Sequence, residues 1–169
     1  MAGTKNSNFQ IVAYLYIAHL WLIIKQQKQK AMINKMTFSC VYVLNQDSAY
    51  DFFVNKLGFK VHTDAPLGKG NRWLTVTPPD QPEMEISLLL VREGEMMTKE
   101  AAKVVADLVK KGTFGHGGFE CNDIYATYEE LKSKGVEFAH APKEEFYGVA
   151  TVFNDDSGNW FSLTQKVAK

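Results

Sequence analysis

Three ionisable side chains in this sequence could act on a small molecule, and each lies in a short apolar run. Glu85 lies within MEISLLLV and His116 within HGGFEC, and Arg72 begins the alternating segment RWLTVT. A carboxylate and an imidazole can carry protons or hold a cation, but in strands they also occur as hydrogen-bonded structural groups, Glu85 then pairing with Arg72 or a lysine. The guanidinium of Arg72 can hold a carboxylate or another oxyanion by two parallel hydrogen bonds.

The sequence contains two cysteines, Cys40 and Cys121, and both lie in apolar strand patterns. With no disulfide framework and no paired metal-ligand spacing, we expect buried free thiols in a reducing compartment, and therefore a cytoplasmic protein. A cysteine nucleophile needs a nearby base and partial exposure. Neither cysteine is expected to be one.

Aromatic side chains supply the other candidates for a binding surface, because they offer a large area to a flat or hydrophobic ligand. Tyr147 precedes Gly148 at the start of a predicted strand, so we expect it at the mouth of a pocket. The alternative is that most of these rings form an ordinary core. The set comprises Phe38, Tyr42, Trp73, Phe119, Tyr147, Phe153 and Trp160.

A repeated pattern predicts the elements that position these residues. Residues 36–61 and 113–138 each predict a strand, a capped amphipathic helix, a glycine stop and a second strand. Asn45 aligns with Asp123, 78 positions later, and Gly58 with Gly135, 77 positions later, so one helix is a residue shorter. Chance similarity of two amphipathic helices is the alternative, but the shared order of features favours a true repeat.

The pattern predicts an α+β fold of two βαβββ modules, residues 36–92 and 113–166, joined by a linking helix in 93–112. The modules are expected to form a curled mixed sheet around a cavity. Module one has predicted strands at 38–44, 59–63, 72–77 and 84–91 and a helix at 47–57. The linking helix spans 93–111, with Ala101, Val104, Val105, Leu108 and Val109 on its buried side. Module two has a strand from Phe114, a helix from Asp123 and strands at 136–140, 147–154 and 160–165.

Residues 1–31 differ from the rest and are interpreted as a leader to a single domain at 32–169. Residues 9–24 are almost continuously apolar and precede KQQKQK. A helix of this length spans about 24 Å, less than the ~30 Å hydrocarbon core of a membrane. A non-native extension, an interfacial helix and a membrane anchor are the alternatives, and membrane association is not expected. The extension hypothesis predicts that a chain starting at Met32 folds and stays soluble.

Five segments in order resemble the vicinal oxygen chelate superfamily, the group of glyoxalases, bleomycin-resistance proteins and extradiol dioxygenases. They are AYDFFVNKLGFKV, RWLTVTPPDQPEMEISL, GHGGFECNDI, LKSKGVEF and VFNDDSGNWFSL, and the resemblance covers about residues 36–165. It implies a glyoxalase/bleomycin-resistance-like fold. It also implies a homodimer, because paired βαβββ sheets in that family often complete one another across two chains.

The resemblance further implies a divalent metal held by side chains of the first and last strands of each module. His116 falls on the second-module ligand and Glu85 near the carboxylate ligand of the first, so they are the candidate catalytic and metal residues. Phe38 and Ser162 stand at the other two ligand positions. An apolar ring and a neutral hydroxyl cannot replace an imidazole and a carboxylate around a divalent cation. We therefore predict no metal cofactor, or a weakly held divalent metal.

The favoured hypothesis is a protein that binds a small hydrophobic or aromatic molecule in its cavity without a complete metal site. The alternative is a metal-dependent glyoxalase-like lyase or extradiol-type dioxygenase using His116 and Glu85, and a structural or interaction module is a third class. Enzymatic activity is thus left open. Basic and acidic side chains number 19 each, so no nucleic-acid partner is predicted. The predicted substrate-binding residues are Phe38, Arg72, Trp73, Tyr147, Trp160 and Ser162.

Overall fold

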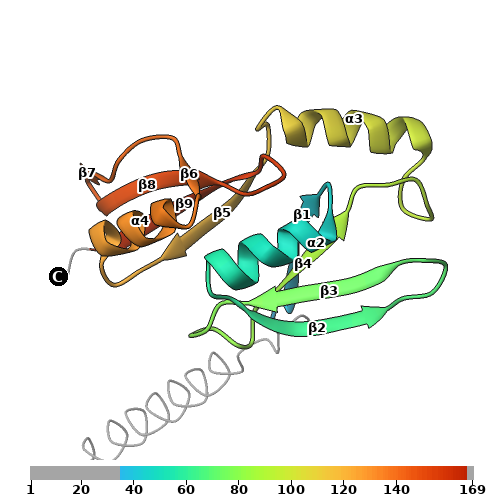
Figure 1. Cartoon of the computed structure of the whole chain (residues 1–169), viewed down its shortest axis with the longest axis horizontal. Coiled ribbons are helices and arrows are strands. Elements are labelled where there is room, and N and C mark those ends of the chain that lie inside the picture. The colour runs from blue at the N-terminus through green and yellow to red at the C-terminus, as the bar shows by residue number, and fades with distance from the viewer. Residues whose placement is uncertain (1–34, 167–169) are drawn as a thin grey trace, which may run out of the picture. The chain divides into compact units, whose positions relative to one another are not determined.

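The computed structural model describes residues 35–166, and the leader hypothesis for residues 1–31 lies outside them. Within this range no helix is long and apolar enough to cross a membrane. Module one follows the predicted order of strand, helix and three strands (Figure 1). Its elements are β1 Phe38–Val43, α2 Gln46–Tyr50, the π-helix η1 Asp51–Lys56, β2 Lys60–Pro66, β3 Arg72–Thr77 and β4 Glu85–Leu90.

Module two repeats this order after the linking helix α3 and contains one additional short strand. The elements are α3 Lys99–Lys110, β5 Gly115–Glu120, α4 Ile124–Ser133, β6 Glu137–Phe138, β7 Lys143–Glu145, β8 Gly148–Asn154 and β9 Trp160–Lys166. Each module builds one mixed sheet, ordered β1-β4-β3-β2 in sheet A and β5-β9-β8-β6 in sheet B, with β7 paired to β8. The first and last strands of each module are parallel neighbours. The predicted α+β fold of two βαβββ modules is confirmed.

The helix signals of the sequence act as predicted in both repeats. Asn45 caps α2 and Asp123 caps α4, each accepting hydrogen bonds from backbone N–H groups of the first turn. Gly58 and Gly135 follow the two helices with φ of 77°, a left-handed conformation that favours glycine. The repeat read from the sequence therefore corresponds to two equivalent structural units.

The helix of module one nevertheless contains a π-helical stretch that module two lacks. In η1, the N–H of Leu57 donates to the carbonyl of Phe52, five residues earlier. A π-helical turn takes up one residue more than an α-helical turn. It accommodates the additional residue that separates the cap from the glycine stop in module one, and Phe52 and Phe53 both stay buried.

One hydrophobic core joins the two modules. Phe53 meets Phe161 edge-on at 5.9 Å between ring centroids, and Phe59 meets Phe119 at 5.2 Å. Because side chains alternate along a strand, the residues between such core positions point to the opposite side of their sheet. We name these sides the outer faces. The outer face of sheet A comprises Phe38, Cys40, Tyr42, Thr63, Trp73, Thr75, Thr77, Glu85, Ser87 and Leu89, and that of sheet B comprises Gly115, Gly118, Glu120, Ala150, Val152, Asn154, Trp160, Ser162 and Thr164.

The turn between β8 and β9, residues 155–159, ties module two to the end of β1. Asn159 is fully buried, and its amide nitrogen donates to the carbonyl of Tyr42 and to the Asp155 carboxylate. The backbone N–H of Leu44 donates to the hydroxyl of Ser157. Burial raises the pKa of Asp155, and its hydrogen bonds with Asn159 oppose that shift. These contacts fix where the two modules meet.

The linking helix differs from its prediction in start and in buried side. It begins at Lys99 because Thr98 accepts the capping hydrogen bond. Its buried residues are Ala102 and Val109, whereas Val104, predicted to be buried, is 57% exposed. The helix carries two adjacent apolar stripes, and the periodic pattern does not reveal which stripe meets the rest of the chain.

The edge of sheet B also differs from the predicted strand at 136–140. Only Glu137 and Phe138 pair there as β6, and pairing along β8 resumes at Lys143 in the unpredicted strand β7. Pro142 lies between them and has no N–H for a strand ladder. The predicted strand is therefore shorter than expected, and β7 lies beyond its predicted end. In sheet A, β2 runs on to Pro66, beyond its predicted end.

Candidate functional site

The outer face of sheet A gathers three of the predicted site residues. Phe38 and Glu85 are register partners on the parallel strands β1 and β4. The Phe38 ring meets that of Trp73 edge-on with centroids 5.7 Å apart, and 42% of Phe38 is exposed. Oε2 of Glu85 lies 3.1 Å from Nδ1 of His62, so its partner is a β2 histidine rather than Arg72 or a lysine. This face combines an aromatic pair with a carboxylate–imidazole pair.

Arg72 begins β3 and is already engaged by two carboxylates. Its Nε and Nη2 donate to the two carboxylate oxygens of Asp64 and its Nη1 donates to Asp47, each at 2.7 Å. The hydrogen bonds with Asp64 hold the pKa of that carboxyl below its ordinary value and raise the pKa of Arg72. Arg72 and Trp73 line a pocket of about 210 Å³ whose walls include β4 residues and the segment 92–97. A ligand oxyanion must compete with Asp64 and Asp47 for this guanidinium.

On the outer face of sheet B, the Trp160 indole lies across a glycine-rich strand. A Cβ added at Gly115 would overlap the indole ring, and one added at Gly118 would lie 3.3 Å from the Cβ of Ser162. The missing side chain at Gly115 therefore lets the ring cross β5 closely, while 40% of Trp160 stays exposed. Ser162 is half-buried on the same face. The result is an aromatic platform rather than a set of ionisable groups.

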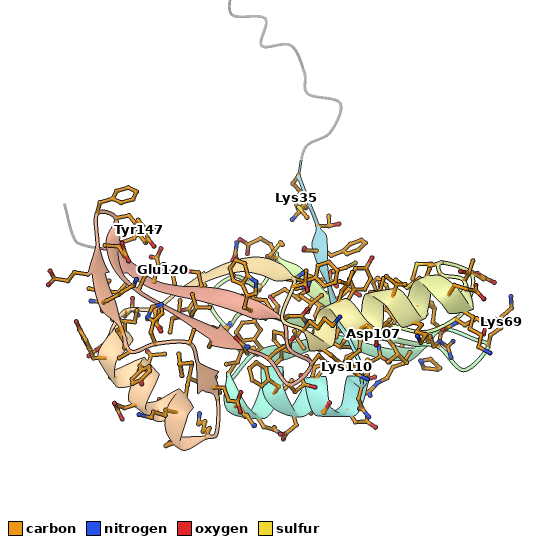
Figure 2. The ribbon with its side chains drawn as sticks, turned by 90° about the horizontal axis from the view of Figure 1, so that it is seen from above. Lys35, Lys69, Asp107, Lys110, Glu120 and Tyr147 are labelled. Carbon is orange, nitrogen blue, oxygen red and sulfur yellow. The ribbon has the colours of Figure 1, made fainter. Side chains whose placement is uncertain are left out.

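Tyr147 lies apart from these residues, at the tip of the β7–β8 hairpin (Figure 2). Its ring packs edge-on against Phe146 at 4.9 Å, and Phe146 is 98% exposed. Sequence reasoning did not single out Phe146, although two adjacent aromatic residues in the polar hairpin KEEFYG were a signal. An exposed aromatic pair at a hairpin tip suits contact with a ligand or a second chain.

His116 takes part in the contact between the modules. Its Nε2 lies 3.0 Å from Oδ1 of Asn159. Because the amide nitrogen of Asn159 donates to Tyr42 and Asp155, the amide oxygen must accept, and Nε2 of His116 carries the proton. A protonated ring nitrogen has no lone pair to give to a metal ion.

The residues of one chain do not fit the divalent metal that the resemblance implies. Glu85 belongs to sheet A and His116 to sheet B, and each has its own partner in the structure. Between residues 35 and 166, no three His, Cys, Asp or Glu side chains are grouped so that they could hold a metal ion. Phe38 and Ser162, at the other two expected positions, are not side chains that bind divalent metals strongly.

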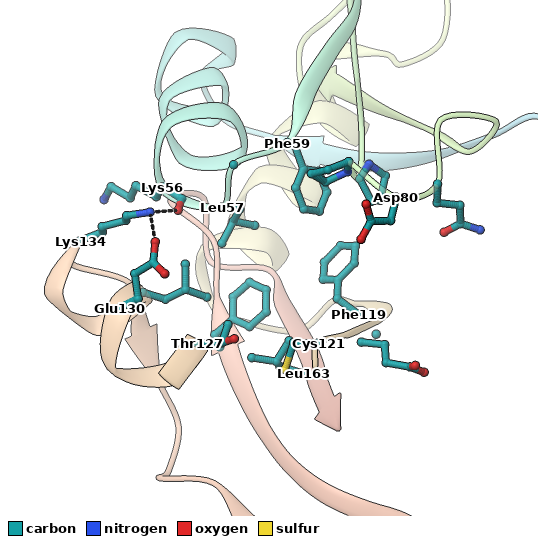
Figure 3. A pocket seen from close by; sticks show the side chains of 18 residues that line it. Lys56, Leu57, Phe59, Asp80, Phe119, Cys121, Thr127, Glu130, Lys134 and Leu163 are labelled. Atoms are coloured by element: carbon teal, nitrogen blue, oxygen red, sulfur yellow. Dashed lines mark hydrogen bonds and ion pairs between the residues drawn. The ribbon is translucent and has the colours of Figure 1, made fainter. Parts of the chain in front are cut away.

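A larger pocket, of about 630 Å³, is lined by residues of both modules (Figure 3). Its apolar lining includes the edge-on rings of Phe59 and Phe119. At its rim Lys134 donates to the Glu130 carboxylate at 2.7 Å and to the carbonyl of Lys56 at 3.3 Å. None of the eight predicted site residues lines this pocket.

Two of its lining rings, Phe119 and Phe153, belong to the candidate aromatic residues, but the pocket itself was not predicted, because most of its lining comes from segments that each look like ordinary core or surface. They are the end of η1, the loop 78–81, and parts of β5, α4, β8 and β9. Cys121 also lines it, and burial raises the pKa of its thiol. This cysteine is therefore protonated and unreactive at neutral pH.

Comparison with known sequences identifies one family. Residues 33–163 match the family model described as Glyoxalase/Bleomycin resistance protein/Dioxygenase superfamily. YetH of Bacillus subtilis (strain 168) is 34% identical over 134 residues, which are 79% of this chain and 100% of YetH.

Solved structures share the fold along almost their whole length. The crystal structure of UcmS2 has a TM-score of 0.75 and 42% sequence identity, covering 79% of this chain and 98% of that chain. That of TnmS3, described as an antibiotic binding protein from Streptomyces sp. CB03234, has a TM-score of 0.63 and 26% identity, covering 81% of this chain and 99% of that chain.

Proposed function

This chain belongs to the glyoxalase/bleomycin resistance protein/dioxygenase superfamily, and we propose that it binds a small hydrophobic or aromatic molecule at the outer faces of its sheets. The observation that carries the proposal is the exposed Trp160 ring lying across Gly115. A large ring that is backed by a strand on one side and open on the other can stack on a planar ligand.

A homodimer is part of this proposal, because neither outer face alone encloses a ligand. The two modules share one topology. A two-fold axis can therefore place the outer face of sheet A of one copy opposite the outer face of sheet B of the other, and the same symmetry creates a second, equivalent pair of faces. Phe38 and Trp73 of one copy then face Trp160 of the second across the ligand. The Phe146–Tyr147 tip is exposed and available to the partner.

Relatives and the remaining predicted residues support the same role. TnmS3 is described as an antibiotic binding protein, which is a precedent for ligand binding on this fold. Arg72 and Ser162 can add polar contacts at the edge of an aromatic ligand. Cys40 and Cys121 are free thiols, in keeping with a cytoplasmic location as part of the proposal.

The test is a calorimetric titration of the full-length protein with a panel of planar aromatic molecules. We expect binding that is indifferent to EDTA and at least about fivefold weaker in Trp160→Ala, because a stacked ring contributes on the order of 1–3 kcal/mol. Thr127→Phe, which puts a ring into the 630 Å³ pocket, is the matched control and should bind like the wild type. Loss of binding only in Thr127→Phe, or no binding by any panel member, contradicts the proposal.

Metal-dependent lyase or dioxygenase activity through His116 and Glu85 is the second candidate. The observation in its favour is the 3.1 Å contact between Glu85 and His62, because a carboxylate beside an imidazole can exchange a proton with a bound substrate. Activity on a thiohemiacetal or a catechol, dependent on an added metal and lost in Glu85→Gln, would establish it. Inactivity across a panel of metals eliminates it.

A further inference from the structure

One row of small polar side chains crosses the outer face of sheet A from edge to edge. The strand register sets Cys40 beside Ser87, Ser87 beside Thr75, and Thr75 beside Thr63. Register partners in a sheet point to the same side, so a thiol and three hydroxyls form one row over β1, β4, β3 and β2. We name this row the polar trough.

The middle of the polar trough is closed to solvent, and one of its hydroxyls has no partner. Thr75 is 0% exposed although it lies on an outer face. No hydrogen-bond partner for its Oγ1 is found among the described residues. Thr77, two residues along the same strand, contrasts with it, because its hydroxyl reaches the carbonyls of Gln81 and Met84. A buried hydroxyl without a partner is unfavourable and marks a place where a hydrogen-bonding group can be added.

Two aromatic rings close the trough. Phe38 comes from β1 and Trp73 from β3, and β4 runs between these strands. Strands two apart are separated by about 10 Å, yet the ring centroids are only 5.7 Å apart. The rings therefore lean toward each other above β4, where Ser87 is buried. The Trp73 side of this cover is already open, since Trp73 and Ser87 both line the 210 Å³ pocket.

We propose that Phe38 and Trp73 form a lid on the polar trough, and that a planar aromatic ligand bearing a hydroxyl parts the two rings and hydrogen-bonds to Oγ1 of Thr75. The inference rests on the proposed function and specifies its ligand class and its gate. The rings supply the stacking surface, and the Thr75 hydroxyl selects for oxygen on the ligand. A buried site that hydrogen-bonds a hydroxyl rejects an analogue that lacks it.

The experiment compares 1-naphthol with 1-methylnaphthalene on full-length wild type, Thr75→Val and the control Thr127→Val. We expect Thr75→Val to weaken 1-naphthol binding about tenfold, the effect of one hydrogen bond, and to leave 1-methylnaphthalene binding unchanged. Because the lost hydroxyl has no partner, the variant should melt no lower than the wild type. Thr127→Val, which removes a hydroxyl that lines the larger pocket, should bind both probes like the wild type.

The lid is tested by stopped-flow association of 1-naphthol. Trp73→Ala removes half of the cover and should bind faster than the wild type, whereas Trp73→Phe should retain slow entry. Equal affinity of wild type and Thr75→Val for 1-naphthol, or an unchanged association rate in Trp73→Ala, overturns the inference and leaves the proposed function standing. Failure of the wild type to bind either probe counts against both.

Discussion

The two modules share one topology, but the side chains on their outer faces are arranged in opposite ways. In module one, Phe38 and Trp73 lean together over a row of small polar residues. In module two, β5 has no side chain at Gly115 and Gly118, and the exposed Trp160 ring lies across Gly115. The repeated backbone thus determines where a surface lies, and a few side chains determine whether that surface is closed or available.

The repeat positions Phe38 and His116 show how far this divergence goes. They are aligned in the repeat, yet Phe38 packs against an aromatic ring on an outer face, and His116 hydrogen-bonds within module two to Asn159, whose amide also donates to Tyr42 of module one. The helices diverge as well, because the helix with the π-helical stretch η1 has one residue more between its cap and its glycine stop than α4 has. Equivalent positions in a duplicated fold therefore need not have equivalent roles.

The largest expected effect separates the two faces of a single strand. Phe161→Ala should destabilise the protein by about 3–5 kcal/mol, because the ring is buried in the shared core. Trp160→Ala, at the adjacent exposed position, should cost less than about 1 kcal/mol. Denaturant unfolding of both variants measures the difference. An equal loss of stability in the two variants would contradict the assignment of Phe161 to the core and of Trp160 to the outer face of sheet B.

The helices can be compared by deleting one residue from each. Removing Glu129 from α4 turns Leu131 by about 100° and should cost about 2–5 kcal/mol by taking it out of the core. Removing Asn55 from η1 should convert the π-helical stretch into α-helix and cost under about 1 kcal/mol. Thermal melts and hydrogen exchange are the readouts. A larger cost for the Asn55 deletion would contradict the inference that η1 accommodates one additional residue.

His116 and His62 offer a smaller contrast. His116→Ala leaves the buried oxygen of Asn159 without a donor, so a loss of about 1–3 kcal/mol is expected. His62→Ala removes partly exposed contacts with the Glu85 carboxylate and the Thr63 hydroxyl and should cost under about 0.5 kcal/mol. Urea titrations at pH 7 provide the measurement. A His62 effect as large as the His116 effect would speak for a structural role of the Glu85 pair.

The smallest expected effect concerns pH and the Asp64–Arg72 pair of module one. Arg72 lowers the pKa of Asp64 in the folded state, so the pair stabilises the fold above pH ~4, the ordinary pKa of an aspartate. That contribution is lost as pH falls through the lowered pKa. The melting temperature of the wild type should exceed that of Asp64→Asn at pH 6 and approach it near pH 2. Asp107→Asn controls for the loss of one charge, and a constant difference across pH would contradict the prediction.

Local signals made most of the fold predictable. The caps Asn45 and Asp123, the glycine stops and the strand Arg72–Thr77 all depend on neighbours in sequence, and the structure has them as predicted. The buried stripe of α3 was predicted only in part: Val109 is buried, but Val104 is exposed, because helical periodicity allows two stripes and only packing selects one. The strand predicted at 136–140 pairs only at Glu137 and Phe138, and the short strand β7 after Pro142 was not predicted.

The candidate site was less predictable, because its contacts depend on tertiary arrangement. Nothing local indicates that Arg72 binds Asp47, 25 residues earlier, or that His116 finds Asn159, 43 residues later. The polar trough is visible only once four strands are in register. Residue types could be proposed from the sequence, but their partners could not.

The turn at residues 155–159 has a consequence for the order in which the chain is synthesised. Leu44 precedes its partner Ser157 by 113 residues, and Tyr42 precedes Asn159 by 117. At ordinary translation rates of about 5–20 residues per second, roughly 6–20 s pass between them. During that interval Phe52 and Phe53 lack the module-two rings that bury them. We therefore expect the nascent first half to expose apolar rings until residue 161 is made, which favours chaperone binding and aggregation of chains that end before it.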